Sequence, residues 1–236
     1  MMALAEAKVA YRSGESALTG VLVYDRAASE PCPGIVMGPN MMGITESNIA
    51  QARKLASEGY AVLVADLYGI TPASAEEASV AMKAIKDTRE ERSRMHAALA
   101  FLSSDPRVDC SRMAAVGFCY GGHCVLELAR SGAELQAVFC IHGTLDTLSP
   151  AVKGDMHARV VVLNGAGDPF VSPQQILGFC QEMVAAEAEF MFVNYAGAVH
   201  SFTYPRADVE GKMEYNEAVC HRAFSTVFDV LHQVFH

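Results

Sequence analysis

The sequence predicts an α/β fold whose mostly parallel sheet is covered by helices on both faces. Short continuous apolar runs, such as residues 34–38 and 60–66, are typical of strands buried on both sides. Segments with apolar residues at helical spacing alternate with these runs along the chain. The 236 residues are 51% hydrophobic and 19% charged, which is ample for a buried core. No Pro/Gly/Ser linker or repeat divides the chain, so we predict one domain over residues 1–236.

The chain begins with a predicted hairpin. Residues 8–12 and 17–24 have strand-like patterns, and the turn sequence Ser-Gly-Glu between them favours pairing of the two strands. The strand at residues 34–38 follows. Thr45 then has the residue type of a helix N-cap, and an apolar stripe at helical spacing runs from it to Gly59.

The remaining elements continue the alternation. After the strand at residues 60–66, one long helix is predicted over residues 74–102, because its acids come early and its arginines late, as the helix dipole prefers. A strand at residues 113–118 leads directly into a helix at residues 120–130. The last predicted elements are strands at residues 137–141, 160–163 and 190–195 and helices at residues 173–186 and 212–235.

Charge and hydropathy exclude several classes of function. Lysine and arginine total 18 against 27 acids, a net charge of −9, so the chain lacks the basic face of a nucleic-acid-binding protein. The longest apolar runs are far too short to span a membrane. The N-terminal segment carries Glu6 and has no basic region before an apolar one, which argues against a signal peptide. We therefore expect a cytoplasmic protein with no nucleic-acid or membrane partner.

The seven cysteines show no disulfide rhythm, no CxxC and no Cys/His pair at zinc-site spacing, so neither a disulfide framework nor a bound metal is expected. Six of them are predicted to be reduced and buried as small apolar side chains: Cys32, Cys110, Cys124, Cys140, Cys180 and Cys220.

The seventh, Cys119, lies in the strongest local motif, Gly117-Phe118-Cys119-Tyr120-Gly121, between a predicted strand and a predicted helix. Glycines two residues before and after a nucleophile permit the sharp turn that lifts its side chain above a sheet. The N-terminus of the following helix would favour a thiolate and, later in a reaction, an oxyanion. The motif therefore marks Cys119 as a candidate nucleophile.

Two later motifs supply an acid and a base in the order expected after such a nucleophile. Asp168 follows the strand at residues 160–163, and His200 follows the strand at residues 190–195. Taken separately, Asp168 also fits a turn residue before proline, and His200 a polar loop histidine. Together with Cys119 they predict a Cys-His-Asp triad.

These motifs resemble the dienelactone hydrolases over nearly the whole chain. The similar segments are LASEGY at residues 55–60, ADLYG at 65–69, GFCYGG at 117–122, GDPFV at 167–171 and HSF at 200–202. The resemblance implies an α/β-hydrolase fold with a mostly parallel eight-stranded sheet and a triad of Cys119, His200 and Asp168. It further implies oxyanion N–H groups from Met41 and Tyr120, no cofactor, and a monomer or weak homodimer.

The chain departs from that family's pattern at two places. Asn40 stands where well-known members have a glutamate that helps control cysteine ionisation, and an amide cannot exchange a proton in that way. Tyr204 stands where they have an arginine for the substrate carboxylate, with Arg206 two residues further on. A pocket bounded by Met41 and Met42, with Phe170, Tyr204 and His142 as further candidate wall residues, would favour neutral aryl esters over anionic lactones.

Two further histidines have open interpretations. His142, at the end of a predicted strand, is either part of the pocket wall or a hydrogen-bonded structural residue. His123, one turn into the helix after Cys119, is expected to pack on the helix surface rather than join the site.

The primary hypothesis is a cysteine hydrolase of small lactones and activated carboxylic esters, similar to carboxymethylenebutenolidase. Promiscuous hydrolysis of aryl esters and phosphotriesters is expected from the soft thiolate and the oxyanion site. The alternative, from another class, is a non-catalytic or thiol redox-sensing protein on the same scaffold.

Overall fold

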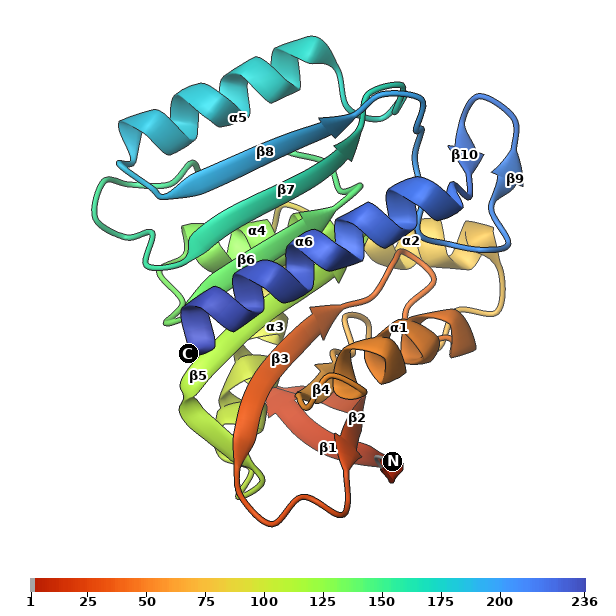
Figure 1. Cartoon of the computed structure of the whole chain (residues 1–236). Coiled ribbons are helices and arrows are strands. Elements are labelled where there is room, and N and C mark those ends of the chain that lie inside the picture. The colour runs from red at the N-terminus through yellow and green to blue at the C-terminus, as the bar shows by residue number, and fades with distance from the viewer. Residues whose placement is uncertain (1–2) are drawn as a thin grey trace.

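A computed structural model describes residues 3–236 and contains one eight-stranded sheet in the order β1-β2-β4-β3-β5-β6-β7-β8 (Figure 1). β1 pairs antiparallel with β2 and β2 with β4, while every other neighbouring pair is parallel. The predicted fold class is confirmed. The strands are β1 (Leu4–Ser13), β2 (Ser16–Asp25), β3 (Cys32–Gly38), β4 (Ala61–Val64), β5 (Val108–Phe118), β6 (Ala137–Ile141), β7 (Arg159–Gly165) and β8 (Phe190–Tyr195).

Helices cover both faces of this sheet. The helices are α1 (Glu46–Ala56), α2 (Ala75–Ile85), α3 (Arg89–Ser103), α4 (Tyr120–Arg130), α5 (Pro173–Ala185) and α6 (Glu217–Phe235). The buried residues of α1 and α6 join the core on one face, and those of α3, α4 and α5 join the core on the other (Figure 1). Among the helices of residues 3–236, none combines the length and apolarity needed to cross a membrane.

The single long helix predicted over residues 74–102 is wrong, because α2 and α3 are separate helices. The chain reverses at Asp87, whose φ of 61° is left-handed, and Thr88 becomes the N-cap of α3. The Asp87 amide donates to the Glu91 carboxylate at 3.0 Å, so a side chain in the first turn of α3 stabilises the break. The arginines that suggested the end of one long helix lie in the first half of α3, whose last turn has no basic residue.

The closing helix also begins later than predicted. Residues before Glu217 form a small hairpin of β9 (Asp208–Val209) and β10 (Met213–Glu214) instead of the first turn of that helix. Asn216 is the N-cap, and its side chain accepts the Val219 N–H at 3.1 Å. The hairpin contacts the candidate site, since the Glu214 amide donates to the His200 carbonyl.

The cysteines are all free thiols, and Cys124, Cys140 and Cys220 are buried as expected. Cys110 is exposed, which contradicts its prediction. The register between β3 and β5 shifts from Pro33–Asp109 to Gly34–Met113, so Cys110 lies in a bulge outside the paired ladder.

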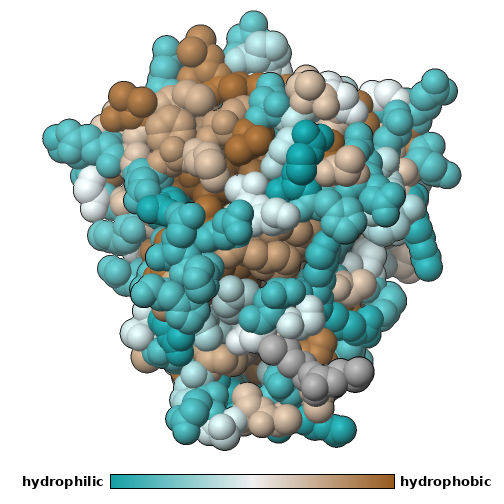
Figure 2. Space-filling view, viewed as in Figure 1, coloured by the Kyte–Doolittle hydropathy of each residue, from teal (hydrophilic) through white to brown (hydrophobic). Residues whose placement is uncertain are grey.

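The surface in the same orientation is mostly hydrophilic, with apolar side chains gathered at the upper left, where α5 lies (Figure 2). Leu177 and Val184 are the exposed large apolar residues of that helix. Neither belongs to the cleft described below.

Candidate active site

Cys119 sits in a backbone conformation that its flanking glycines make possible. Its φ of 55° and ψ of −122° place a non-glycine residue in a sparsely populated region between β5 and α4. A Cβ at Gly117 would lie 2.0 Å from the Gly121 carbonyl oxygen, and one at Gly121 would lie 2.0 Å from that of Gly38. Only glycine permits this approach of strand, turn and helix, so the pattern read from the sequence has a steric cause.

His142 holds the amide of this strained residue. The Cys119 N–H lies 3.2 Å from His142 Nδ1 and 3.1 Å from the Ile141 carbonyl oxygen. Because an amide only donates, Nδ1 must carry a lone pair, and the ring proton then lies on Nε2, which is 2.8 Å from the Thr203 hydroxyl oxygen. Both interpretations of His142 from the sequence apply. Its ring is hydrogen-bonded on both nitrogens, and the residue also lines the cavity beside Cys119.

Asp168 and His200 meet at the carboxyl ends of β7 and β8. His200 Nδ1 lies 2.8 Å from Asp168 Oδ2, with both side chains almost fully buried. The other carboxylate oxygen, Oδ1, accepts the Phe170 N–H at 2.9 Å, which fixes the orientation of the acid. The ring of Phe170 packs edge-on against His200, with 4.9 Å between centroids.

The electrostatics of the thiol and the imidazole are coupled. Burial opposes ionisation of Cys119, but hydrogen bonds from His200 and from the amides of Tyr120 and Met41, together with the charge of His200, lower the pKa of the thiol. Burial likewise opposes protonation of His200, yet the bonds to Asp168 and Cys119 raise its pKa to about 10. Both directions favour a thiolate–imidazolium pair at neutral pH.

A network of side chains shapes the loop that carries the Met41 amide. Asn40 Oδ1 accepts the Met42 N–H at 3.0 Å, and the Asn40 N–H donates to Asn48 at 3.2 Å. The Tyr68 hydroxyl donates to the Met41 carbonyl at 2.9 Å. Asn40 therefore fixes the backbone of this loop, which is a different role from the proton exchange of the glutamate at this position in the resembling family.

Sequence reasoning did not single out Asn48 or Tyr68. The Asp66 carboxylate accepts the Tyr68 and Gly69 N–H groups at 3.0 and 2.8 Å. Asp66 thereby positions Tyr68, whose hydroxyl binds the Met41 carbonyl. This contact joins the loops after β3 and β4, and no local pattern of residues in the sequence predicts it.

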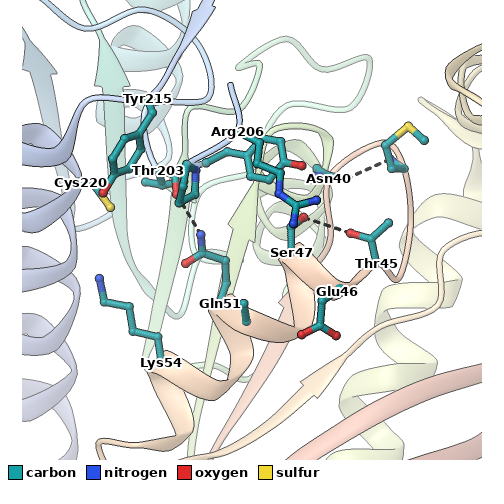
Figure 3. A pocket seen from close by; sticks show the side chains of 14 residues that line it. Asn40, Thr45, Glu46, Ser47, Gln51, Lys54, Thr203, Arg206, Tyr215 and Cys220 are labelled. Carbon is teal, nitrogen blue, oxygen red and sulfur yellow. Dashed lines mark hydrogen bonds between the residues drawn. The ribbon is translucent and has the colours of Figure 1, made fainter. Parts of the chain in front are cut away.

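Two adjoining chambers open next to Cys119. The inner one, of about 250 Å³, is lined by Cys119 and His142 and by the apolar side chains of Met41, Met42 and Phe118. The outer one, of about 570 Å³, lies over α1 and is shown in Figure 3. Residues that line both chambers are Asn40, Met42, Ser47, Gln51, Thr203 and Tyr204.

The predicted pocket residues divide between these chambers. Asn40, Met42 and Tyr204 line both, whereas Arg206 lines only the outer one. Phe170 lines neither and contributes its packing against His200 instead.

His123 lines neither chamber and packs, fully buried, between α3 and α4. Its Nε2 lies 3.4 Å from Glu91 Oε2 and 3.6 Å from Asp87 Oδ1, a grouping of the size that can hold a cation. The Lys86 ammonium, 2.9 Å from Asp87, already brings a positive charge to one of these carboxylates.

The family model described as "Dienelactone hydrolase family" matches residues 18–235. Among solved structures, "m3DLH" is 34% identical with a TM-score of 0.92, and the alignment covers 98% of this chain and 99% of that one. A "Dienelactone Hydrolase-like Promiscuous" phosphotriesterase, P91 from metagenomic libraries, is 32% identical with a TM-score of 0.91, covering 98% of each chain. A Bradyrhizobium protein named "Probable 2-oxo-3-(5-oxofuran-2-ylidene)propanoate lactonase" is 25% identical over 183 residues, 72% of this chain and 73% of its own.

Proposed function

The chain belongs to the dienelactone hydrolase family, and from this premise we propose that it hydrolyses lactones and activated carboxylic esters with Cys119 as nucleophile. The proposal is carried by one observation: His200 and Asp168 are hydrogen-bonded at 2.8 Å beside the Cys119 thiol, which lies at a helix N-terminus and whose pKa the charge of His200 lowers. The continuous sheet supports a single catalytic domain over residues 1–236. Carboxymethylenebutenolidase-type lactone opening is the specific activity that this family suggests.

Acylation begins from the thiolate–imidazolium pair. The Cys119 sulfur attacks the carbonyl carbon, and the carbonyl oxygen takes the negative charge beside the Met41 and Tyr120 amides. When the tetrahedral intermediate collapses, the leaving alkoxide takes the proton from His200 Nε2. A lactone ring opens at this step, and the acyl group remains on sulfur as a thioester.

Deacylation reverses the role of His200. The neutral imidazole takes a proton from water as the water oxygen attacks the thioester carbonyl, and the acid product leaves as the thiolate re-forms beside the imidazolium. Asp168 stabilises that charge through its 2.8 Å contact with Nδ1.

Mass spectrometry after mixing with a p-nitrophenyl ester tests this assignment. A transient acyl group on Cys119, and turnover abolished in Cys119→Ala and His200→Ala, are expected. Wild-type turnover in either variant would contradict the mechanism. Sulfenylation by peroxide without acylation would instead support a thiol redox sensor, the alternative function.

The inner chamber favours small neutral substrates. The residues that line it carry no ammonium, guanidinium or carboxylate, and Tyr204 rather than an arginine faces it. We expect aryl esters to be hydrolysed with a higher kcat/KM than a small lactone whose carboxylate is conjugated to the reacting ring. A clear preference for the anionic dienelactone would contradict this proposal.

Phosphotriesters with aryl leaving groups are a second candidate class, favoured by the 32% identical neighbour P91. The thiolate would attack phosphorus, expel the aryloxide and form an S–P bond that water then cleaves. We expect weak turnover that survives chelators and is lost in Cys119→Ala. Turnover lost with EDTA, or retained in that variant, would contradict this activity.

A further inference from the structure

The outer chamber holds positive charge that the proposed reaction does not use. Lys54 and Arg206 line it, and within residues 3–236 neither side chain lies in an ion pair with a carboxylate. The chamber's remaining charged residue, Glu46, is paired with Arg53 at 2.5 Å. The chamber thus has a local excess of positive charge in a chain whose net charge is −9.

Lys54 lies where a bound anion would neutralise the charge of its ammonium group. The side chain is half-buried, and its ammonium lies 3.5 Å from the centroid of the Phe224 ring. Figure 3 shows it rising from α1 toward Tyr215 and Cys220. Partial removal of an ammonium from water costs free energy, and an aromatic face offsets only part of that cost.

Arg206 approaches the same chamber from the other side. In Figure 3 its side chain extends from the loop after β8, with the guanidinium directed toward Ser47 of α1. A guanidinium offers paired N–H donors that match a carboxylate. Between the two cations, the Gln51 amide donates to the Thr203 carbonyl at 3.0 Å and so joins the chamber floor to the loop that follows His200.

The two chambers adjoin, because they share lining residues that include Gln51, Thr203 and Tyr204. The inner part contains the reacting thiol and no charged wall, and the outer part contains Lys54 and Arg206. A substrate with its ester bond at Cys119 can therefore extend a flexible chain past Tyr204 toward these cations.

We propose that Lys54 and Arg206 bind a carboxylate at the far end of the substrate, remote from the bond that is cleaved. The substrate class is then half-esters of dicarboxylic acids, or esters of ω-hydroxy acids, with an apolar chain between the two groups. The inference rests on the proposed function, which places the reacting bond at Cys119. It deepens that function by separating the neutral reacting end from a charged distal end.

The test compares each free acid with its methyl-capped, neutral counterpart. One pair places the carboxylate on the acyl side, as in p-nitrophenyl hydrogen suberate, and the other on the alcohol side, as in O-acetyl-6-hydroxyhexanoic acid. We expect kcat/KM for one free acid to exceed that of its capped form by about five- to tenfold, mainly through KM, and this ratio to fall at high salt. A ratio near one for both pairs would overturn the proposal.

Variants assign the effect to the two cations. Arg206→Gln and Lys54→Met should each lower the ratio, and Arg206→Glu should bring it below one. The matched control is Lys153→Met, since Lys153 is an exposed lysine paired with Glu187 that lies outside both chambers, and it should leave the ratio unchanged. A ratio that persists in the Lys54→Met/Arg206→Gln double variant would overturn the proposal.

Failure of the subsite is distinguishable from failure of the proposed function. Loss of the ratio with continued, Cys119-dependent turnover of the capped esters contradicts only the subsite. If turnover is absent altogether, calorimetric titration of the protein with monomethyl suberate and with dimethyl suberate still decides: tighter binding of the monoacid, lost in Arg206→Gln, supports the subsite, and equal or absent binding overturns it.

Discussion

His200 and His142 are both buried, and their ring centroids are only 5.2 Å apart, yet their protonation is driven in opposite directions. The bonds to Asp168 and the thiol raise the pKa of His200 to about 10 against the effect of burial. Burial, reinforced by the charge of His200, lowers the pKa of His142 well below its usual range. One ring is thus suited to carry a proton and the other to remain neutral.

The difference comes from the partners of each ring rather than from its depth. His200 faces a carboxylate and a thiol, whereas His142 faces a backbone N–H and a hydroxyl group. A neutral His142 can accept the Cys119 amide and hold the strained turn, and it avoids placing a second positive charge beside His200. Burial alone therefore does not decide whether a histidine is charged, because the groups that face its two nitrogens can outweigh it.

Replacing Asp168 should reduce the difference in protonation between His200 and His142 more than any other substitution. Asp168→Asn removes the charge that stabilises imidazolium at His200, and kcat/KM on a p-nitrophenyl ester should fall by about 10³- to 10⁴-fold. Asp155→Asn, in an exposed loop, is the control and should stay near wild type. A loss smaller than tenfold would show that the carboxylate is not needed to charge His200.

The pH dependence of Cys119 alkylation measures the effect of the charged His200 ring on the thiol. Because the thiol pKa is lowered, the thiolate is lost only when the pH falls through that lowered value, so iodoacetamide should modify Cys119 at a lower pH than it modifies an ordinary thiol. Ester turnover should decline at the other limit, as the pH rises through about 10 and His200 loses its proton. Because Cys110 is an exposed thiol that also reacts with iodoacetamide, the alkylation rate must be measured separately for the peptide that contains Cys119.

His200→Asn serves as the counterpart in the same measurement. Without the imidazolium the thiol should behave as an ordinary one, and alkylation of Cys119 at pH 6 should slow by on the order of a hundredfold. An unchanged rate would mean that the helix N-terminus alone lowers the thiol pKa.

Substitution of His142 should have an intermediate effect. His142→Phe removes the acceptor of the Cys119 N–H but leaves the Ile141 carbonyl, so kcat should fall by about tenfold with a smaller change in KM. His142→Asn keeps an acceptor oxygen near the Nδ1 position and should recover part of the loss. Equal activity of the two variants would contradict a positioning role.

Thr203→Val should have the smallest effect. It removes the hydroxyl at His142 Nε2 and so weakens the preference for the tautomer that leaves Nδ1 free, with an expected loss of about threefold in kcat. Nitrogen-15 NMR of the histidine side chains checks the cause: His142 should appear as the neutral Nε2–H form in the wild type and as a mixture of tautomers in the variant. A single unchanged tautomer would contradict this explanation.

Much of this molecule is determined locally by its sequence. The apolar runs of β3, β4, β6 and β7 are buried on both faces, and the helical stripes that follow most of the strands favour parallel crossovers. Gly117 and Gly121 identify the turn at Cys119 because only glycine avoids contact with backbone there. The order of Cys119, Asp168 and His200 at strand ends predicts the proposed triad, since parallel strands bring their carboxyl ends to one edge of the sheet.

The tertiary structure decided what depends on contacts between distant segments. The break at Asp87 rests on a side chain in the following helix, and the role of Asn40 rests on Asn48 and on the shape of its loop. The protonation of His142 depends on a strand end placed next to Thr203, 61 residues away in sequence. Hydrogen bonding and desolvation act over a few ångströms in space, and the chain positions that share such a neighbourhood are set by the strand order, which no local pattern of residues records.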